Sequence, residues 1–152
     1  MRRGVLFAAV SLTALTMGLE FAHVLEWPQK QHYPGPLYVR LQESLYIWFG
    51  NVGGVLYVLA VIATVVLAVL ARPRSLLGVA AGLQVVGLAS FLAVVYPVNQ
   101  RLPVNSGGAV PADWAALRDR WELGHAIGFG LFAVSFVLLL AFLTRRRSLS
   151  EH

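Results

Sequence analysis

Residues 45–70 of this chain read LYIWFGNVGGVLYVLAVIATVVLAVL and contain no charged side chain. The stretch is longer than the roughly 20 apolar residues that an α-helix needs to cross a bilayer. Three further apolar runs of similar length occupy residues 4–25, 76–98 and 123–143. The sequence therefore predicts an all-α fold, an antiparallel bundle of four transmembrane helices. This bundle should form a single membrane domain over residues 1–152, with longer connections at 26–44 and 99–122.

The composition excludes several classes of protein. Of the 152 residues, 58% are hydrophobic and only 12% are charged, which is too apolar for a soluble domain of this size. The absence of cysteine excludes thiolate metal sites, iron–sulfur clusters and covalently attached c-type haem. The net charge of +5 comes from short basic clusters beside the apolar runs, as in topology signals. We therefore expect a lipid bilayer and no nucleic acid as partner.

The basic residues also predict an orientation. Seven lie on the side of the membrane that carries both termini, and five lie on the other side. Because cytoplasmic segments carry an excess of Lys and Arg, both termini should be cytoplasmic in a multi-pass plasma-membrane protein. The seven residues are Arg2, Arg3, Arg72, Arg74, Arg145, Arg146 and Arg147.

Two further patterns concern packing and the membrane interface. Gly78-x-x-x-Gly82 and Gly124-x-x-x-Gly128 let helix backbones approach closely, either within the bundle or between copies in a homo-oligomer.

Most of the Trp and Tyr side chains near the outer boundary are expected to form an interfacial aromatic belt. These are Trp27, Trp48, Trp114, Trp121, Tyr33, Tyr38, Tyr46 and Tyr96.

Two Glu-x-x-His motifs lie at the outer ends of predicted spans. Glu20 and His23 are near the outer end of the first span, and Glu122 and His125 are near the outer start of the fourth. Ionisable residues in a membrane normally face the bundle interior and have a partner. Because the two helices run in opposite directions, Glu20 should lie level with His125 and His23 level with Glu122.

The motifs are compatible with several kinds of chemistry. Paired Glu-x-x-His motifs bind metals in di-iron carboxylate bundles, which need one more Glu from each remaining helix. Here the second helix offers Glu43 but the third offers only Asn99, so a mononuclear Fe, Zn, Mn or Cu site held by Glu20, His23, Glu122 and His125 is the metal hypothesis. A b-type haem between the two histidines, a metal-free substrate pocket and purely structural pairing are the alternatives.

Other polar residues are given simpler roles. The amides of Asn51 and Gln84 lie within spans and should form interhelical hydrogen bonds. The first outer connection contains Glu26, Lys30, His32 and Arg40, which are expected to be solvated surface residues.

Three short motifs resemble a known family. They are Trp27-Pro28 after the first span, Pro97-Val98-Asn99 after the third, and the segment 117–125, which ends in Trp121-Glu-Leu-Gly-His125. In these motifs the chain resembles the anthrone-oxygenase-like family of small four-helix membrane proteins. The chain departs from the family pattern at Gly128, where the family often has Arg.

The resemblance implies a membrane-embedded oxidoreductase that acts on a small hydrophobic or aromatic molecule without a known organic cofactor. His125, Trp121 and Asn99 carry over from the family motifs as catalytic residues. Glu122 is added as a catalytic residue because it lies three residues before His125, and Arg118 is expected to line the same pocket. A non-enzymatic metal-binding or haem-binding protein and an accessory membrane subunit are the alternative functions.

Overall fold

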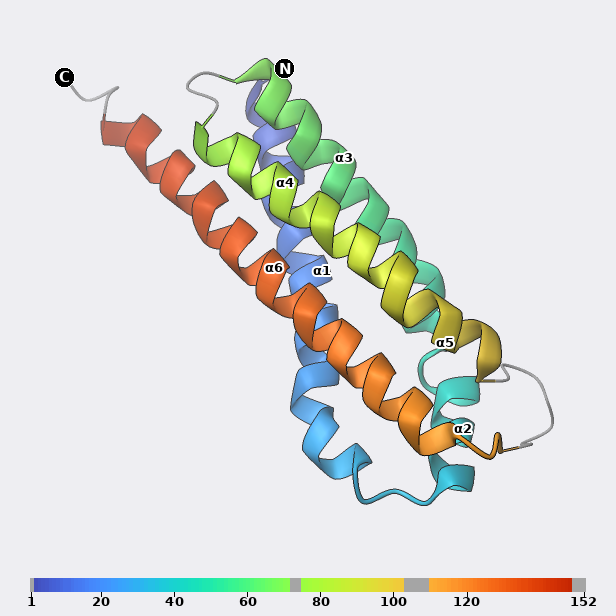
Figure 1. Cartoon of the computed structure of the whole chain (residues 1–152). Coiled ribbons are helices and arrows are strands. Elements are labelled where there is room, and N and C mark those ends of the chain that lie inside the picture. The colour runs from blue at the N-terminus through green and yellow to red at the C-terminus, as the bar shows by residue number, and fades with distance from the viewer. Residues whose placement is uncertain (1, 72–74, 103–109, 149–152) are drawn as a thin grey trace.

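The structure, a computed structural model, describes residues 2–71, 75–102 and 110–148, and this part of the chain is helical without strands (Figure 1). Four long α-helices and two short π-helical segments form most of it, and the shorter helices α2 and α5 complete it. The elements are α1 (Arg2–Lys30), α2 (Gly35–Ser44), η1 (Phe49–Gly53), α3 (Gly54–Leu70), α4 (Ser75–Ser90), η2 (Phe91–Val95), α5 (Tyr96–Arg101) and α6 (Trp114–Ser148).

The long helices form an antiparallel four-helix bundle. In it α1 packs on α3 and α6, and α4 packs on α3 and α6. The start of α1 and the end of α6 lie at one end, and α2 lies at the opposite end, which we call the α2 end (Figure 1). Four helical segments are long and apolar enough to cross a membrane, namely Arg3–Lys30, Phe49–Leu70, Ser75–Arg101 and Trp114–Arg145. The predicted fold of a multi-pass membrane bundle is confirmed.

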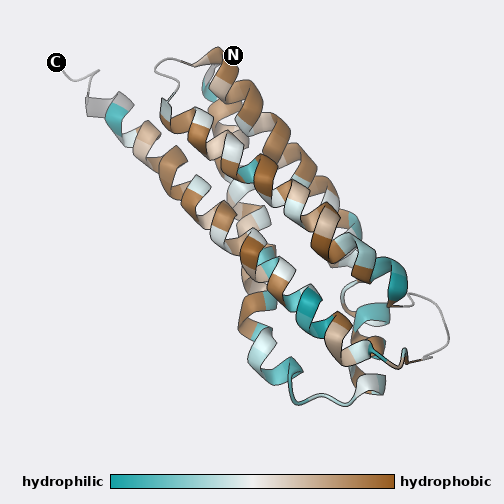
Figure 2. Cartoon of the chain, in the orientation of Figure 1, coloured by the Kyte–Doolittle hydropathy of each residue, from teal (hydrophilic) through white to brown (hydrophobic). Residues whose placement is uncertain are grey.

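The outward surface of the bundle is suited to lipid. Large apolar side chains such as Phe7, Val55, Val86 and Val137 are more than half exposed along all four long helices. Figure 2 shows that hydrophobic residues prevail along the long helices and that hydrophilic positions are concentrated at the α2 end. Since exposed apolar surface of this extent is unfavourable in water, the surroundings that it fits are a bilayer.

Helix boundaries differ from the sequence prediction at the α2 end. The first helix continues to Lys30 and the last begins at Trp114, while α2 forms within the connection predicted for 26–44. Helical geometry thus extends beyond the apolar runs, because polar residues that face the bundle interior continue the helices there. The basic residues Arg72 and Arg74 of the predicted cytoplasmic turn lie outside the described residues.

The two glycine motifs have different environments. A Cβ at Gly124 would clash with Val95 and come within 3.2 Å of Val94, so α6 approaches η2 as closely as the motif predicts. By contrast, a Cβ at Gly78 or Gly82 would meet nothing within 4 Å. Gly78 and Gly82 therefore leave an open face on α4.

A polar layer crosses the centre of the bundle. The Gln84 amide nitrogen on α4 donates hydrogen bonds of 2.9 Å to Thr13 on α1 and 2.8 Å to Ser135 on α6. Each hydroxyl in turn donates to a backbone carbonyl. The interhelical role predicted for Gln84 is confirmed, whereas Asn51 is exposed on η1 and belongs to the pocket described next.

Candidate functional site

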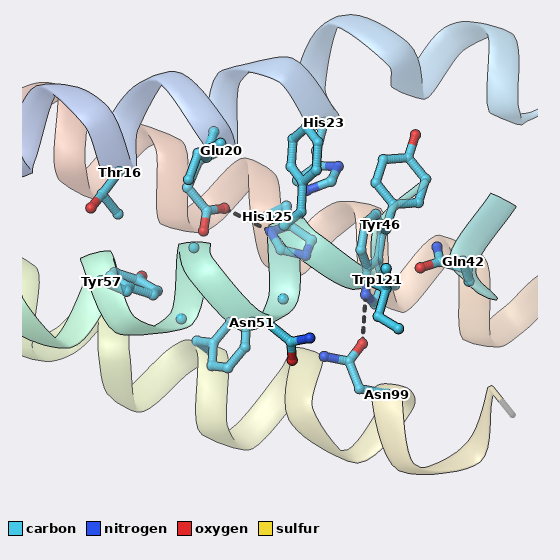
Figure 3. Close-up of a pocket in the computed structure, with 17 residues that line it drawn as sticks. Thr16, Glu20, His23, Gln42, Tyr46, Asn51, Tyr57, Asn99, Trp121 and His125 are labelled. Carbon is cyan, nitrogen blue, oxygen red and sulfur yellow. Dashed lines mark hydrogen bonds and ion pairs between the residues drawn. The ribbon is translucent and has the colours of Figure 1, made fainter. Parts of the chain in front are cut away.

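A cavity of about 180 Å³ lies inside the bundle near the α2 end. Its wall combines polar residues of α1, α2, η1, α3, α5 and α6 with apolar and aromatic side chains between them (Figure 3). Its polar lining residues are Thr16, Glu20, His23, Gln42, Tyr46, Asn51, Tyr57, Asn99, Trp121 and His125. Both π-helical segments reach this cavity, η1 through most of its length and η2 through Phe91. Such segments occur often at functional sites, because they displace side chains from the regular helical positions.

The first and last helices meet through a buried carboxylate–imidazole pair. Glu20 Oε2 lies 2.8 Å from His125 Nδ1, and the two residues are only 6% and 7% exposed. The prediction that Glu20 lies level with His125 is therefore confirmed. His125 Nε2 is buried and has no hydrogen-bond partner. A carboxylate at Nδ1 favours the tautomer that carries its proton there, so that Nε2 is left as an acceptor.

Gly128 is what makes room for this pair. An ideal Cβ at this position would lie 2.9 Å from Glu20 Oε2 and 3.5 Å from the Tyr57 hydroxyl. Any larger residue would push the carboxylate away from His125. The absence of a side chain at residue 128 therefore has a local structural consequence.

His23 does not pair with Glu122 as predicted. Its ring packs against His125, Trp121 and Tyr46, with ring centroids 4.3, 4.6 and 5.0 Å away. Its Nδ1 lies 3.9 Å from a carboxylate oxygen of Glu26 on the same helix. Axial haem ligands lie on opposite faces of the porphyrin, and two imidazoles in van der Waals contact leave no space for one. The donor geometry therefore does not fit a b-type haem.

Lys30 takes the position opposite Glu122. Its ammonium lies 3.2 Å from Glu122 Oε1 and 3.1 Å from Glu26 Oε2, and the residue is 1% exposed. The same nitrogen lies over the rings of Tyr46 and Trp121, 4.5 and 4.9 Å from their centroids. The prediction that Lys30 is a solvated surface residue is wrong, because helix α1 continues and turns this side chain into the bundle. His32 and Arg40 are exposed, as predicted.

The predicted metal ligands do not form a metal-binding cluster. Glu20 is engaged by His125, and Glu122 is engaged by the Lys30 ammonium, which supplies the positive charge that a metal would supply. Over the ranges 2–71, 75–102 and 110–148, no three His, Cys, Asp or Glu side chains are arranged to hold an ion. The residues present therefore do not fit a metal site, although all four predicted ligands are buried close together.

The predicted catalytic residues fall into two groups. The Trp121 indole nitrogen donates a 2.8 Å hydrogen bond to Asn99 Oδ1, and both residues line the cavity together with His125 (Figure 3). Glu122 is instead behind the cavity wall, where it accepts a 3.5 Å hydrogen bond from the Tyr38 hydroxyl. Burial, followed by the charge of Glu122, raises the pKa of Tyr38, so its hydroxyl remains a neutral donor.

Two other sequence predictions need correction at this end of the bundle. Tyr38, Tyr46 and Trp121 are buried instead of belonging to an interfacial belt, whereas Trp48 and Tyr96 are exposed as a belt requires. Arg118 is not among the cavity-lining residues. Its guanidinium contacts Asp119 at 2.9 Å and donates to the Gln31 carbonyl, which ties α6 to the end of α1.

The most important residue that the sequence analysis misses is Lys30. The polar stripe on the first helix passes through Glu20, His23 and Trp27 in steps of three and four residues. One further step of three reaches Lys30, so the spacing contains the signal. The signal is missed when the first helix is assumed to end at residue 25 with the apolar run.

Comparison with protein-family models, with curated proteins and with solved structures finds no match to this chain. The resemblance to the anthrone-oxygenase-like family therefore stays a prediction.

Proposed function

We propose that this protein is a membrane-embedded oxidoreductase of the anthrone-oxygenase type, in which His125 is the general base. The observation that carries the proposal is the buried Glu20–His125 pair at the wall of a mostly apolar cavity. A carboxylate that holds the imidazole by Nδ1 orients it and stabilises the imidazolium that forms when Nε2 accepts a proton. This arrangement needs no metal.

The reaction starts from a small hydrophobic molecule with an acidic C–H or phenolic O–H group. His125 removes the proton, and the resulting carbanion transfers electrons to dioxygen as a C–O bond forms. The hydroperoxide that results from protonation then loses water, which converts a CH₂ group to a ketone; in a phenol this CH₂ is the ring carbon of the keto form, and the product is a quinone. One oxygen atom enters the substrate and the other leaves as water, so dioxygen is the oxidant and no organic cofactor is consumed.

Asn99 is suited to hold the substrate oxygen. Because an indole N–H can only donate, the hydrogen bond from Trp121 fixes the Asn99 carbonyl oxygen as its acceptor. The amide nitrogen is thereby left to donate to a ligand in the cavity. A preorganised donor of this kind stabilises negative charge that develops on the substrate oxygen.

Oxygen consumption by the protein in lipid nanodiscs tests this proposal, with single-ring phenols that fit the cavity as substrates. His125→Gln and Glu20→Gln should each lower turnover by about 10² to 10⁴-fold, the usual contribution of a general base. His32→Gln is the matched control, since His32 is exposed. Turnover that is equal in all three variants would rule out a base at residue 125.

We also propose that the α2 end faces outward from the plasma membrane, on the strength of the basic residues near the termini. The chain contains no cysteine, so single cysteines report topology without background. A membrane-impermeant maleimide should label Arg40→Cys in intact cells and should label Ser75→Cys only after lysis. Labelling of Ser75→Cys alone in intact cells would reverse the orientation.

The open glycine face of α4 is where we propose that two copies associate. In detergent, Gly82→Leu should shift the protein toward the monomer, measured by sedimentation. A wild-type protein that is already monomeric in lipid would exclude this association.

A further inference from the structure

The cavity is closed toward the α2 end. Helix α2 buries Tyr38 and Val39 against Val95, Val98 and Leu117, which forms an apolar plug above the cavity. Beside this plug, the Lys30 ammonium and its two carboxylates fill the space behind Tyr46 and Trp121. A ligand that approaches along the bundle axis from this end would have to displace both.

The exposed part of the cavity wall lies on η1 instead. Gly50 and Asn51 line the cavity and are also exposed on the surface of a helix that is apolar enough to cross the membrane. Ideal Cβ atoms at Gly50 and Gly54 meet nothing within 4 Å, so the wall is thin there and borders open space. Toward α1 the same segment is sealed, because a Cβ at Gly53 would lie 3.3 Å from Leu19.

The gap beside η1 faces α5. Helices α3 and α4 pack on each other, but η1 makes no comparable packing with η2 or α5 among the described residues. In Figure 3 the amides of Asn51 and Asn99 lie on the same side of the cavity, one from each of these two elements. We call this opening, between η1 and α5, the lateral mouth.

The surroundings of the lateral mouth are apolar. Val52 and Val55 on the η1 side and Leu92 and Tyr96 on the other side are about half exposed. A polar amide such as Asn51 is costly at this depth unless it serves a ligand or a partner. The exposed Trp48, next to η1, is suited to the membrane interface, so the mouth lies just inside the acyl region.

Cavity size then limits what enters. An apolar cavity of roughly 150 Å³ holds one benzene molecule, and this cavity of about 180 Å³ is only slightly larger. A ligand with an apolar tail longer than its ring must leave the tail outside the cavity. The lateral mouth offers such a tail a continuous path into lipid.

From this geometry we infer that the site takes the single-ring head of a lipid-dissolved amphiphile, an alkylated phenol or hydroquinone, whose tail extends through the lateral mouth into the bilayer. The ring occupies the cavity beside His125, and its oxygen is within the region served by the two amides. The choice of a phenolic head rests on the proposed function. The lateral mouth and the position of the tail are instead inferred from the shape of the cavity wall at η1, and they do not depend on the proposed function.

Binding of two labelled phenols to the protein in lipid nanodiscs tests the inference, with affinities expressed per mole fraction in the membrane. 4-Nonylphenol carries a tail that must pass the mouth, whereas 4-methylphenol fits within the cavity. Gly50→Leu places a bulky side chain at the mouth and should weaken 4-nonylphenol binding by about tenfold more than it weakens 4-methylphenol binding. Gly130→Leu is the matched control, because Gly130 is also exposed on a spanning helix and has no neighbour within 4 Å.

The outcomes separate this inference from the proposed reaction. Equal effects of Gly50→Leu and Gly130→Leu, equal losses for the two phenols, or no binding of 4-nonylphenol to the wild-type protein would each overturn the inference. If binding follows the expected pattern but no dioxygen is consumed, the proposed reaction fails and the binding site remains. If dioxygen is consumed with 4-methylphenol alone, the reaction stands and the lateral mouth fails.

Discussion

Replacing Lys30 with methionine should destabilise the bundle strongly. Methionine keeps most of the length of the side chain, but it removes an ammonium that lies 3.1 and 3.2 Å from two carboxylates and over two aromatic rings. The loss of one partner from a buried ion pair costs about 3–5 kcal/mol, because the remaining charge has no compensation. Glu122 is 1% exposed and carries most of this cost, whereas the Glu26 side chain is 39% exposed and can still reach solvent.

Thermal unfolding of detergent-solubilised protein, followed by circular dichroism, measures the effect. At about 2–4 °C per kcal/mol for a chain of this length, Lys30→Met should lower the midpoint by roughly 6–20 °C. Arg40→Met is the control, since Arg40 is an exposed cation on α2, and its midpoint should stay within about 2 °C of the wild type.

A double variant identifies the unpaired charge as the cause. Glu122→Gln in the Lys30→Met background should recover a large part of the lost midpoint, because an amide can be buried at a lower cost than an isolated carboxylate. The reasoning is refuted if Lys30→Met unfolds at the same temperature as Arg40→Met. It is also refuted if the double variant is no more stable than Lys30→Met alone.

Three further outcomes follow from the packing and from the donor sets. Gln84→Leu removes two interhelical hydrogen bonds and should cost about 1 kcal/mol at roughly 0.6 each, measured as a lower thermal midpoint with unchanged phenol binding. Gly124→Ala should cost about 1–3 kcal/mol in the same assay, because its Cβ meets the η2 valines, while Gly130→Ala should be neutral or stabilising; equal midpoints for the two would contradict the close approach of α6 to η2. Added Zn²⁺ or Fe²⁺ should leave the midpoint unchanged, and a metal-dependent rise that is lost in His23→Ala would restore the metal hypothesis.

Much of the candidate site follows from spacing along two helices. Thr13, Thr16, Glu20 and His23 form one polar stripe, and Glu122, His125 and Ser135 belong to another. All of these residues are buried, as their positions on helix faces predict. The helix axis and the antiparallel order then place Glu20 beside His125, so this pair can be predicted from sequence.

The partners of the other ionisable groups cannot be predicted in the same way. Glu122 could face His23, a metal ion or a lysine at nearly the same depth, and the stripe alone does not separate these arrangements. The choice depends on where α1 ends, since only a helix that reaches residue 30 brings the ammonium to Glu122. Hydropathy sets the apolar run, but it does not set the end of a helix whose last turns are polar.

By itself, the sequence determined that this chain is a bundle of four membrane-spanning helices and which helix faces turn inward. Hydropathy and periodicity are local properties of the chain, so both can be counted along it. Only the tertiary structure decided that Lys30 pairs with Glu122, that Glu122 lies behind the cavity wall and that Gly50 and Asn51 both line the cavity and are exposed on the surface. These features depend on the rotation of each helix about its axis and on the distances between helices. Contacts between residues far apart in the sequence set both.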